Sequence, residues 1–352
     1  MRLEFINRVK EKDVLGKSIL TNDGSILLRS GIALTEQYIS KLKKLGVLYV
    51  YIEDDRLDDV MVEDERLVKL KRVAMKSMEK IIKNIHVANK RETRDSLRIV
   101  ENLVEYIIDA GDVNKSLYDI QTYDNYTYVH CLDTGIMATF LGLSMHLSES
   151  ELKDLGKGAV LHDIGKTKIP YNIINKKGSL TDEEFLEIKK HPIYGREILE
   201  KNIQIPMEIL EAVEQHHERI DGNGYPYGLP GNQISKYGKI VSICDVYDAV
   251  SNDRSYRKKF SPNGAYELIL AGSGCMFDEK IVKSFKETFA IYPLGCCVRL
   301  SNNIEGYVIR QNKGFPDRPT IRVLYDIGLK QPVPFYEIDL MRELAVTIEE
   351  VV

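Results

Sequence analysis

The chain has 352 residues, of which 43% are hydrophobic and 29% are charged, and its formal net charge is -4. This composition is typical of globular proteins, and the length allows two or three domains and at least one large core. The acidic balance and the lack of a long basic block argue against bulk nucleic acid as a partner, but not against a local basic pocket for a small phosphorylated ligand.

The cysteines and the apolar runs bear on location. Five cysteines are scattered without CxxC pairing, a pattern that predicts a reduced, cytoplasmic protein. The N-terminus MRLEFINRVKEKDVLG has no apolar signal region, and no run of 18 apolar residues occurs. We therefore expect no membrane association.

The first two segments differ in pattern. Residues 1–56 alternate apolar and polar positions around Asp23-Gly24, a hairpin turn, and then give a short helix capped by Thr35. They predict a small α+β module with a regulatory or interaction role. Residues 57–115 carry apolar stripes at helical spacing and predict an amphipathic helical linker. Packing on neighbouring helices is favoured there over a coiled-coil stalk.

The remaining segments are a helical part and a β-rich part. Residues 116–290 are expected to be nearly all helical, with Thr181 and Glu184 in the spacing of a capping box. Residues 291–352 look like short strands joined by Asn, Gly and Pro turns, which predicts a small β-rich C-terminal appendage. The predicted fold class is therefore mainly α.

Histidines and aspartates form a candidate metal constellation in the helical segment. Imidazole and carboxylate ligands without cysteine suit iron, manganese or zinc. The set exceeds what one tetrahedral ion needs, so two ions that share a bridging carboxylate would use it fully. In chain order the candidate ligands are His130, His162, Asp163, His191, His216, His217 and Asp245.

Each of these residues also has an ordinary structural explanation. A lone His130 or His191 is more often a packed core or surface histidine than a ligand. The pair His162-Asp163 is different, because it interrupts an apolar run and buried polar groups must be paired. On a helix Lys166 would face the same site as this pair, and Gly165 indicates a helix end or a close approach by another segment. The joint pattern favours metal binding.

A series of motifs in fixed order resembles the HD-GYP family, the helical metal-dependent phosphodiesterases that hydrolyse cyclic di-GMP. The similarity covers roughly residues 116–290. The motifs are YTYVH ending at His130, HDIGK at 162–166, HPIYG from His191, HH at 216–217, DGNGYP at 221–226, CDVYDAVSNDRSYR at 244–257 and SGCMFD at 273–278.

The resemblance implies an HD-type helical bundle with two divalent ions, iron or manganese first among the candidates. Asp163 is implied to bridge the two ions and to be catalytic. The remaining ligands divide into one set of His130, His162 and Asp245 and another of His191, His216 and His217.

It also implies residues that contact the substrate. Lys166 matches the lysine expected near the scissile phosphate and counts as the second catalytic residue. The arginines after the last aspartate match positions that contact phosphate or guanine, although a solvated pair at a charged helix end is the alternative. The expected substrate contacts are Gly224, Tyr225, Asp248, Arg254 and Arg257.

The chain departs from the trinuclear members of this family at one position. Those members have a glutamate one helical turn before the first histidine ligand, where this chain has Tyr126, four residues before His130. Tyrosine is a poor ligand for that purpose, so two ions are predicted rather than three. Asp124 is expected to be an N-cap or a pocket-wall residue.

The expected reaction is hydrolysis of cyclic di-GMP to pGpG, with the further step to GMP left open. In a two-metal site a bridging water becomes a hydroxide that attacks phosphorus near neutral pH. Two alternatives stay open: a catalytically silent cyclic di-GMP receptor, and an HD phosphohydrolase that acts on another cyclic dinucleotide or nucleotide. Homodimerisation or docking of signalling proteins is open as well, and the metal's identity does not follow from the sequence.

Overall fold

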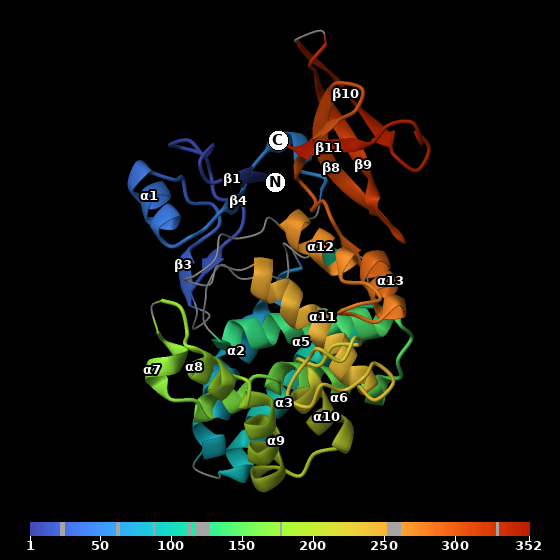
Figure 1. The fold of residues 1–352 in the computed structure, drawn as a ribbon. Coiled ribbons are helices and arrows are strands. Elements are labelled where there is room, and N and C mark those ends of the chain that lie inside the picture. The colour runs from blue at the N-terminus through green and yellow to red at the C-terminus, as the bar shows by residue number, and fades with distance from the viewer. Residues whose placement is uncertain are drawn as a thin grey trace.

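The computed structural model is mainly α, with a helical body at one end of the molecule and two small β-containing parts at the other (Figure 1). The C-terminal strands and the N-terminal module lie together above the helices (Figure 1). The structure describes residues 1–21, 25–60, 64–86, 89–111, 115–116, 127–176, 178–251, 262–328 and 331–352.

The helical body is built around α5 (Thr127–Ser144), which packs against α2, α3, α6, α11 and α13. Apolar residues occur all round this helix, including the fully buried Leu132, Met137 and Leu141, and a helix of that kind is stable only inside a core. The other helices of the body are α6 (Glu149–Leu161), α7 (Tyr171–Ile174), α8 (Asp182–Ile188), α9 (His191–Asn202), α10 (Met207–Gln215), α11 (Lys236–Ser251), α12 (Pro262–Ala271) and α13 (Glu279–Thr288).

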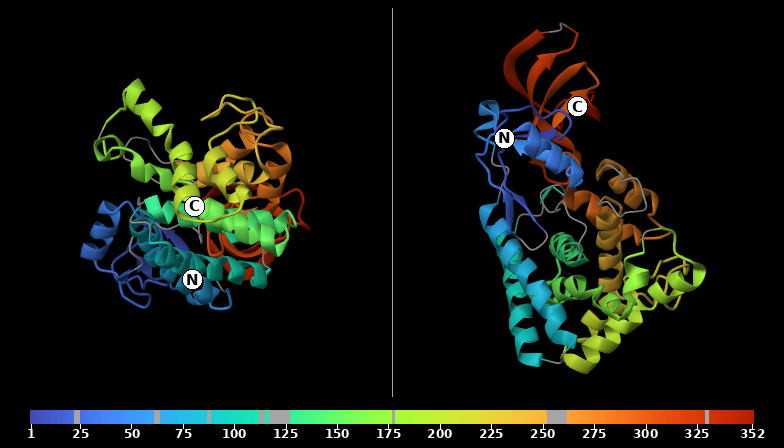
Figure 2. Two further views of the ribbon diagram at one scale, coloured as in Figure 1. Left: turned by 90° about the horizontal axis from the view of Figure 1, so that it is seen from below. Right: turned by 90° about the vertical axis from the view of Figure 1, so that its left-hand side faces the viewer.

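The segment predicted as a linker forms two antiparallel helices, α2 (Glu65–His86) and α3 (Lys90–Ala110), which run side by side along one flank of the body (Figure 2). The side chain of Asn89 caps α3, and Gly111 ends it with a left-handed φ of 62°. Most residues of the predicted apolar stripes pack in the same core as α5 and α6, whereas Val73 is exposed. Packing on neighbours, the favoured alternative, is confirmed.

The N-terminal module is α+β, as predicted. Strand β1 (Arg2–Phe5) pairs antiparallel with β4 (Tyr49–Ile52), and α1 (Glu36–Lys44) begins at Thr35, whose side chain accepts a hydrogen bond from the N–H of Tyr38. Two short strands, β2 (Ile19–Leu20) and β3 (Ile26–Leu28), pair on either side of the predicted hairpin turn. The turn residues Asp23 and Gly24 lie outside the described residues.

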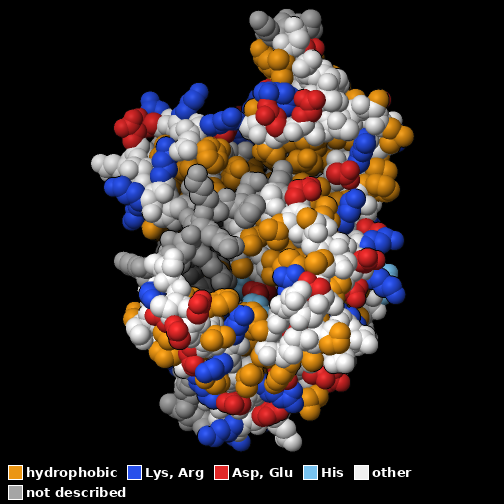
Figure 3. All heavy atoms as spheres, in the orientation of Figure 1, with side chains coloured by type: hydrophobic (Ala, Val, Ile, Leu, Met, Phe, Trp, Pro, Cys, Tyr) orange, Lys and Arg blue, Asp and Glu red, His pale blue; other side chains and the backbone are white. Residues whose placement is uncertain are grey.

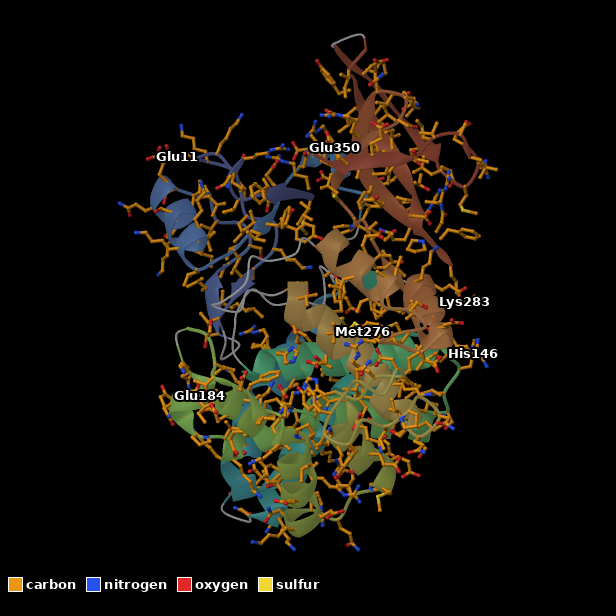
Figure 4. The ribbon with its side chains drawn as sticks, viewed as in Figure 1. Glu11, His146, Glu184, Met276, Lys283 and Glu350 are labelled. Carbon is orange, nitrogen blue, oxygen red and sulfur yellow. The ribbon has the colours of Figure 1, made fainter. Side chains whose placement is uncertain are left out.

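The C-terminal part is an antiparallel sheet with strand order β10-β9-β8-β7-β11. It packs on the N-terminal module, where Leu3 pairs with Cys296 and the buried Arg322 donates to the carbonyl oxygen of Arg56 at 2.9 Å. Glu11 and Glu350, labelled in Figure 4, accordingly lie at the same end of the molecule. The strands are β7 (Cys297–Leu300), β8 (Ile304–Asn312), β9 (Phe315–Asp326), β10 (Gln331–Asp339) and β11 (Ile348–Val351).

Two short elements complete the description. β5 (Lys115–Ser116) pairs in parallel with β6 (Phe289–Ala290), which joins the chain just after α3 to the end of α13. Among the described residues, no helix is both long and apolar enough to cross a membrane.

Candidate metal centre

All seven predicted ligands converge where α5, α6, α9, α10 and α11 meet. In the face drawn in Figure 3, histidine and acidic atoms are visible at the bottom of a hollow. Neighbouring imidazoles lie 4.1 to 5.3 Å apart, centroid to centroid. The ligands come from α5 (His130), the junction of α6 and the 3-10 helix η2, Ile164–Lys168 (His162 and Asp163), the start of α9 (His191), the end of α10 (His216 and His217) and α11 (Asp245).

One group of potential ligand atoms comprises His130, His162 and Asp245, which all come within 4.8 Å of one another. Oδ1 of Asp245 lies 2.9 Å from Nε2 of His130 and 3.6 Å from Nε2 of His162. A second group comprises Asp163, His191, His216 and His217. The division matches the two ligand sets implied by the family resemblance.

Asp163 faces both groups. Its Oδ1 lies 3.2 Å from Nε2 of His191 and 3.9 Å from Nε2 of His216, whereas its Oδ2 lies 3.6 Å from Nε2 of His162 and 4.0 Å from Nε2 of His130. Each carboxylate oxygen thus points to a different set of imidazoles, which is the placement a bridging carboxylate requires.

The hydrogen bonds of the rings show that the cluster suits cations. Nδ1 of His162, His191 and His216 donates to a backbone carbonyl three residues earlier, at 2.6 to 2.8 Å. Because a carbonyl only accepts, Nδ1 carries the proton in the neutral form of each ring, and Nε2, which points into the cluster, is the nitrogen left to bind a cation. This is how metal-ligating histidines are commonly held.

Two buried atoms in the cluster have no hydrogen-bond partner, Nε2 of His162 and Oδ1 of Asp163. Buried polar atoms are rarely left unpaired, since the loss of hydration is costly. A divalent cation among these lone pairs would satisfy both atoms. The donor set of imidazoles and carboxylates therefore fits divalent metal binding.

The charge states of His216, His217 and Asp163 also favour metal binding. Burial and neighbouring imidazoles lower the pKa of His216, and burial lowers that of His217 to about 3, so both rings are neutral near pH 7. Burial alone would raise the pKa of Asp163, but Lys166, His162 and His191 outweigh it and hold that pKa well below its usual range. Neutral imidazole and ionised carboxylate are the forms that bind metal.

Cys131 also comes within reach of His162 and Asp163. Burial raises the pKa of its thiol well above the ordinary value, so the sulfur remains protonated. The thiolate is the ligand form of cysteine, so this protonated thiol is a weaker candidate ligand than the imidazoles and carboxylates around it.

Asp248 has a different place from the one expected. It is fully buried, and its Oδ2 lies 2.6 Å from Nδ1 of His130. The structure therefore does not support the expectation of a substrate contact, because this carboxylate lies against the ring of a candidate ligand. Its position is that of a residue that orients His130.

Lys166 and Gly165 are placed as predicted. The ammonium group of Lys166 makes an ion pair with Oδ2 of Asp163 while its side chain stays partly exposed. A Cβ at Gly165 would lie 1.9 Å from the carbonyl oxygen of His191, so only glycine allows η2 to approach the start of α9 this closely. The anticipated close approach at Gly165 is confirmed.

The DGNGYP loop folds back onto the second ligand group. The ring of Tyr225 stacks on His217, with centroids 4.6 Å apart and an interplanar angle of 27°, and Nζ of Lys189 lies 5.4 Å from the tyrosine centroid. A Cβ at Gly224 would lie 2.4 Å from the backbone nitrogen of Arg219, so the loop needs glycine there.

Glu218 holds this loop and was missed at the sequence level. It is buried, and its carboxylate accepts hydrogen bonds from the backbone N–H of Tyr227 at 2.7 Å and of Leu229 at 2.9 Å. The pattern HHE contains the glutamate directly after the histidine pair, but nothing in that pattern indicates that it binds backbone nine to eleven residues later.

Several predictions fall outside the described residues. These are the phosphate or guanine contacts of Arg254 and Arg257, and the roles of Tyr126 and Asp124. The preference for two ions over three stays a prediction. His146 lies apart from the cluster, exposed at the edge of the helical body (Figure 4).

Comparison with known proteins agrees with this geometry. A family model described as HD domain matches residues 76–281, and one described as KOW domain associated with HD domain matches 297–352. The first match begins inside α2, so it includes most of the segment predicted as a linker. In structure, the chain is similar to an HDG"Y"P protein from Bdellovibrio bacteriovorus, with a TM-score of 0.51 at 17% identity over 80% of this chain and 97% of that one.

Curated relatives cover part of the chain. A cyclic di-GMP phosphodiesterase of Pseudomonas aeruginosa is 33% identical over 251 residues, 71% of this chain and 60% of that protein. A 3'3'-cGAMP-specific phosphodiesterase of Vibrio cholerae is 32% identical over 190 residues, 52% of this chain and 36% of that protein. The chain thus spans less than two thirds of the length of these relatives. The predicted HD-type bundle is confirmed: the chain belongs to the HD domain family.

Proposed function

We propose that this protein is a metal-dependent phosphodiesterase that hydrolyses cyclic di-GMP. The observation that carries the proposal is the pair of ligand groups joined by the two oxygens of Asp163, with the ammonium of Lys166 beside that carboxylate. The Pseudomonas aeruginosa relative, a cyclic di-GMP phosphodiesterase by name, supports the choice of substrate. The reaction adds water across a phosphodiester bond to give linear pGpG.

The proposed cofactors are two divalent ions, iron or manganese. His130, His162 and Asp245 would hold one ion, His191, His216 and His217 the other, and Asp163 both. When bound, such ions supply a nucleophilic water and neutralise charge on the phosphate ester. Imidazole with carboxylate is a donor set that suits both metals.

The chain's own residues would bind and orient the phosphate. Lys166 places a positive charge beside Asp163, where it would offset charge that develops on the phosphoryl oxygens. Tyr225, held against His217, forms a wall beside the second ligand group. Asp248 keeps the ring of His130 in one orientation. These groups are already positioned, so little reorganisation would be required on binding.

The alternative of a catalytically silent receptor would be favoured by the loss of metal ligands. Each of the seven predicted metal ligands is present and converges on the site, so this alternative is disfavoured. A cytoplasmic location is proposed on the cysteines, all five of which are free, as is usual in a reducing compartment.

The test is turnover by the purified chain loaded with Mn²⁺ or, without oxygen, with Fe²⁺. Cyclic di-GMP is supplied and the products are separated by chromatography, with 3'3'-cGAMP in a parallel reaction. We expect pGpG to form from cyclic di-GMP and no product from the Asp163→Asn variant. Tight binding of cyclic di-GMP without product for either metal would contradict the proposed enzymatic activity and favour a receptor. Turnover of 3'3'-cGAMP alone would show that 3'3'-cGAMP, and not cyclic di-GMP, is the substrate.

A further inference from the structure

A cavity of about 270 Å³ begins at the metal centre and runs away from it between α2, η2 and α7. Asp163 and Lys166 line its polar end, so it adjoins the place where the proposed function puts the phosphate. Pockets that enclose whole drug-sized ligands are roughly 300–1,000 Å³. This cavity is therefore large enough for one part of a cyclic dinucleotide and too small for all of it.

Beyond Asp163 and Lys166 the walls are mainly apolar. Met78 and Ile82 of α2 form one side, and the buried Val160 and Ile164 contribute to the lining. An apolar cavity next to a cationic and metal-binding end suits an uncharged flat group attached to a phosphate. The ribose-linked base of a nucleotide has that form, whereas a second phosphate would be poorly accommodated among these side chains.

Tyr171 stands where this cavity opens to solvent. Its side chain lines the cavity, yet the residue is 81% exposed, the highest value among the exposed large hydrophobic residues described. An aromatic ring left in water beside an apolar cavity offers a face for stacking. Asn175, one turn later, also lines the cavity, and its Nδ2 donates to the carbonyl of Tyr171 at 3.2 Å, which leaves its Oδ1 available as an acceptor.

We propose that this cavity is a purine-binding subsite in which one base of the cyclic dinucleotide stacks on Tyr171 and packs against Met78 and Ile82. The inference rests on the proposed function, since it assumes that the phosphate lies at Asp163 and Lys166. It assigns a specificity role to α7 and to α2, neither of which carries a metal ligand.

The absence of tryptophan from the chain allows a direct test. A Tyr171→Trp variant carries a single indole at the cavity mouth, and stacking of a purine would quench its emission. The Mn²⁺-loaded variant is mixed with cyclic di-GMP by stopped flow and read before turnover. The control is Leu186→Trp, at an exposed site on the neighbouring helix that does not line the cavity.

Quenching that saturates for Tyr171→Trp but not for Leu186→Trp is the expected result. Inorganic phosphate, which has no base, should leave the emission unchanged, and equal quenching by phosphate would overturn the assignment. In steady state, Tyr171→Ala should lower kcat/KM for cyclic di-GMP about tenfold, as expected for loss of base stacking, with Leu186→Ala unchanged. Because Tyr171 is so exposed, these variants should fold normally.

The outcomes separate the subsite from the proposed reaction. If the wild-type chain hydrolyses cyclic di-GMP but Tyr171→Ala matches Leu186→Ala and no quenching occurs, the subsite is wrong and the function stands. If the wild-type chain does not hydrolyse cyclic di-GMP but quenching of Tyr171→Trp saturates, the subsite is supported and the proposed reaction is wrong. If neither turnover nor quenching occurs, both ideas fail.

Discussion

Nε2 of His191 lies 3.2 Å from Nε2 of His216, and each ring donates its Nδ1–H to a backbone carbonyl. The two facing nitrogens are therefore both acceptors, an arrangement that is unfavourable in a buried site unless a cation lies between them and their neighbours. Metal binding should consequently stabilise the fold as well as complete the site.

We predict that Mn²⁺ raises the free energy of unfolding. At a free concentration about 100 times its Kd, the gain should be about 2.7 kcal/mol, because the ion binds the native state and not the unfolded chain. Thermal or urea unfolding with Mn²⁺ and with a chelator measures the difference.

The control for this prediction is Asp163→Ala, which removes the carboxylate that faces both ligand groups. It should lose metal loading, turnover and the Mn²⁺-dependent stabilisation together. Retention of two ions and of activity by this variant would remove the bridging role of Asp163.

Metal binding should also release a proton from His130. Burial opposes the charged form of this ring, but hydrogen bonds with Asp245 and Asp248 outweigh it and raise the pKa of His130 to about 9. The metal-free protein therefore carries a proton there at pH 7, and an ion can bind only as that proton leaves. The apparent affinity for Mn²⁺ should therefore increase from pH 7 to about pH 9. Above that pH the ring of His130 has already lost its proton, so it causes no further increase.

Calorimetric titration of Mn²⁺ at pH 7 in buffers with different ionisation enthalpies measures the released protons. We expect about one proton from this ring. The same enthalpy in every buffer would show that His130 is neutral before the ion binds and would contradict the prediction.

Asp248 should act through His130 rather than through substrate. Asp248→Asn keeps the size of the side chain but removes the charge beside Nδ1 of His130. Losses of about 10- to 100-fold in metal affinity are typical when the partner of a ligating histidine is changed, and we expect a loss in that range, with KM little altered at saturating metal. Asp109→Asn, at an exposed site on α3, is the control. A rise in KM for Asp248→Asn with unchanged metal affinity would instead support the substrate contact that the sequence led us to expect.

The difference between Asp248 and the ligands shows what the sequence can predict. The convergence of the candidate ligands was predictable because metal binding requires a particular set of side chains in a recognisable order, and His162-Asp163 is costly to bury for any other purpose. The orientation of Asp248 depends on the angle at which α11 crosses α5, and spacing along one helix does not give that angle.

The division of the fold shows the same limit. Helical stripes predicted α2 and α3, and turn residues predicted the strands after residue 291, because these patterns are local. That Met78 and Ile82 line a cavity beside Asp163 depends on packing between helices far apart in the chain. The pairing of Leu3 with Cys296 is equally nonlocal. Neither arrangement could be derived from residue periodicity.

Removing Glu218 should loosen the DGNGYP loop without removing the metal. Its carboxylate accepts the backbone N–H groups of Tyr227 and Leu229, and hydrogen bonds to charged groups contribute about 1.5–3 kcal/mol each. Glu218→Ala should therefore raise KM for cyclic di-GMP at least tenfold, while metal content by elemental analysis stays the same. Glu208→Ala, at an exposed site on α10, is the control. Loss of metal from Glu218→Ala with an unchanged KM would mean that the glutamate supports the ligands and not the loop.

The last prediction concerns Lys71 of α2 and Asp133 of α5, which form an ion pair of 2.5 Å with side chains 8% and 0% exposed. Asp133 lies one turn after His130, so the pair connects α2 to α5, the helix that carries the candidate ligand His130. Breaking a buried pair leaves one charge without its partner and costs about 3–5 kcal/mol, whereas replacing both partners by apolar residues is often neutral.

Lys71→Met and Asp133→Leu should thus each lower the free energy of unfolding by several kcal/mol, and the double variant should recover most of that loss. Urea unfolding of the four proteins gives the coupling energy. The exposed pair Lys83 and Glu79 on α2 is the control, since exposed pairs contribute at most about 1 kcal/mol. Single variants that lose less than about 1 kcal/mol would show that water reaches the pair. A double variant that is stable but binds Mn²⁺ more weakly would show that the pair also sets the position of His130.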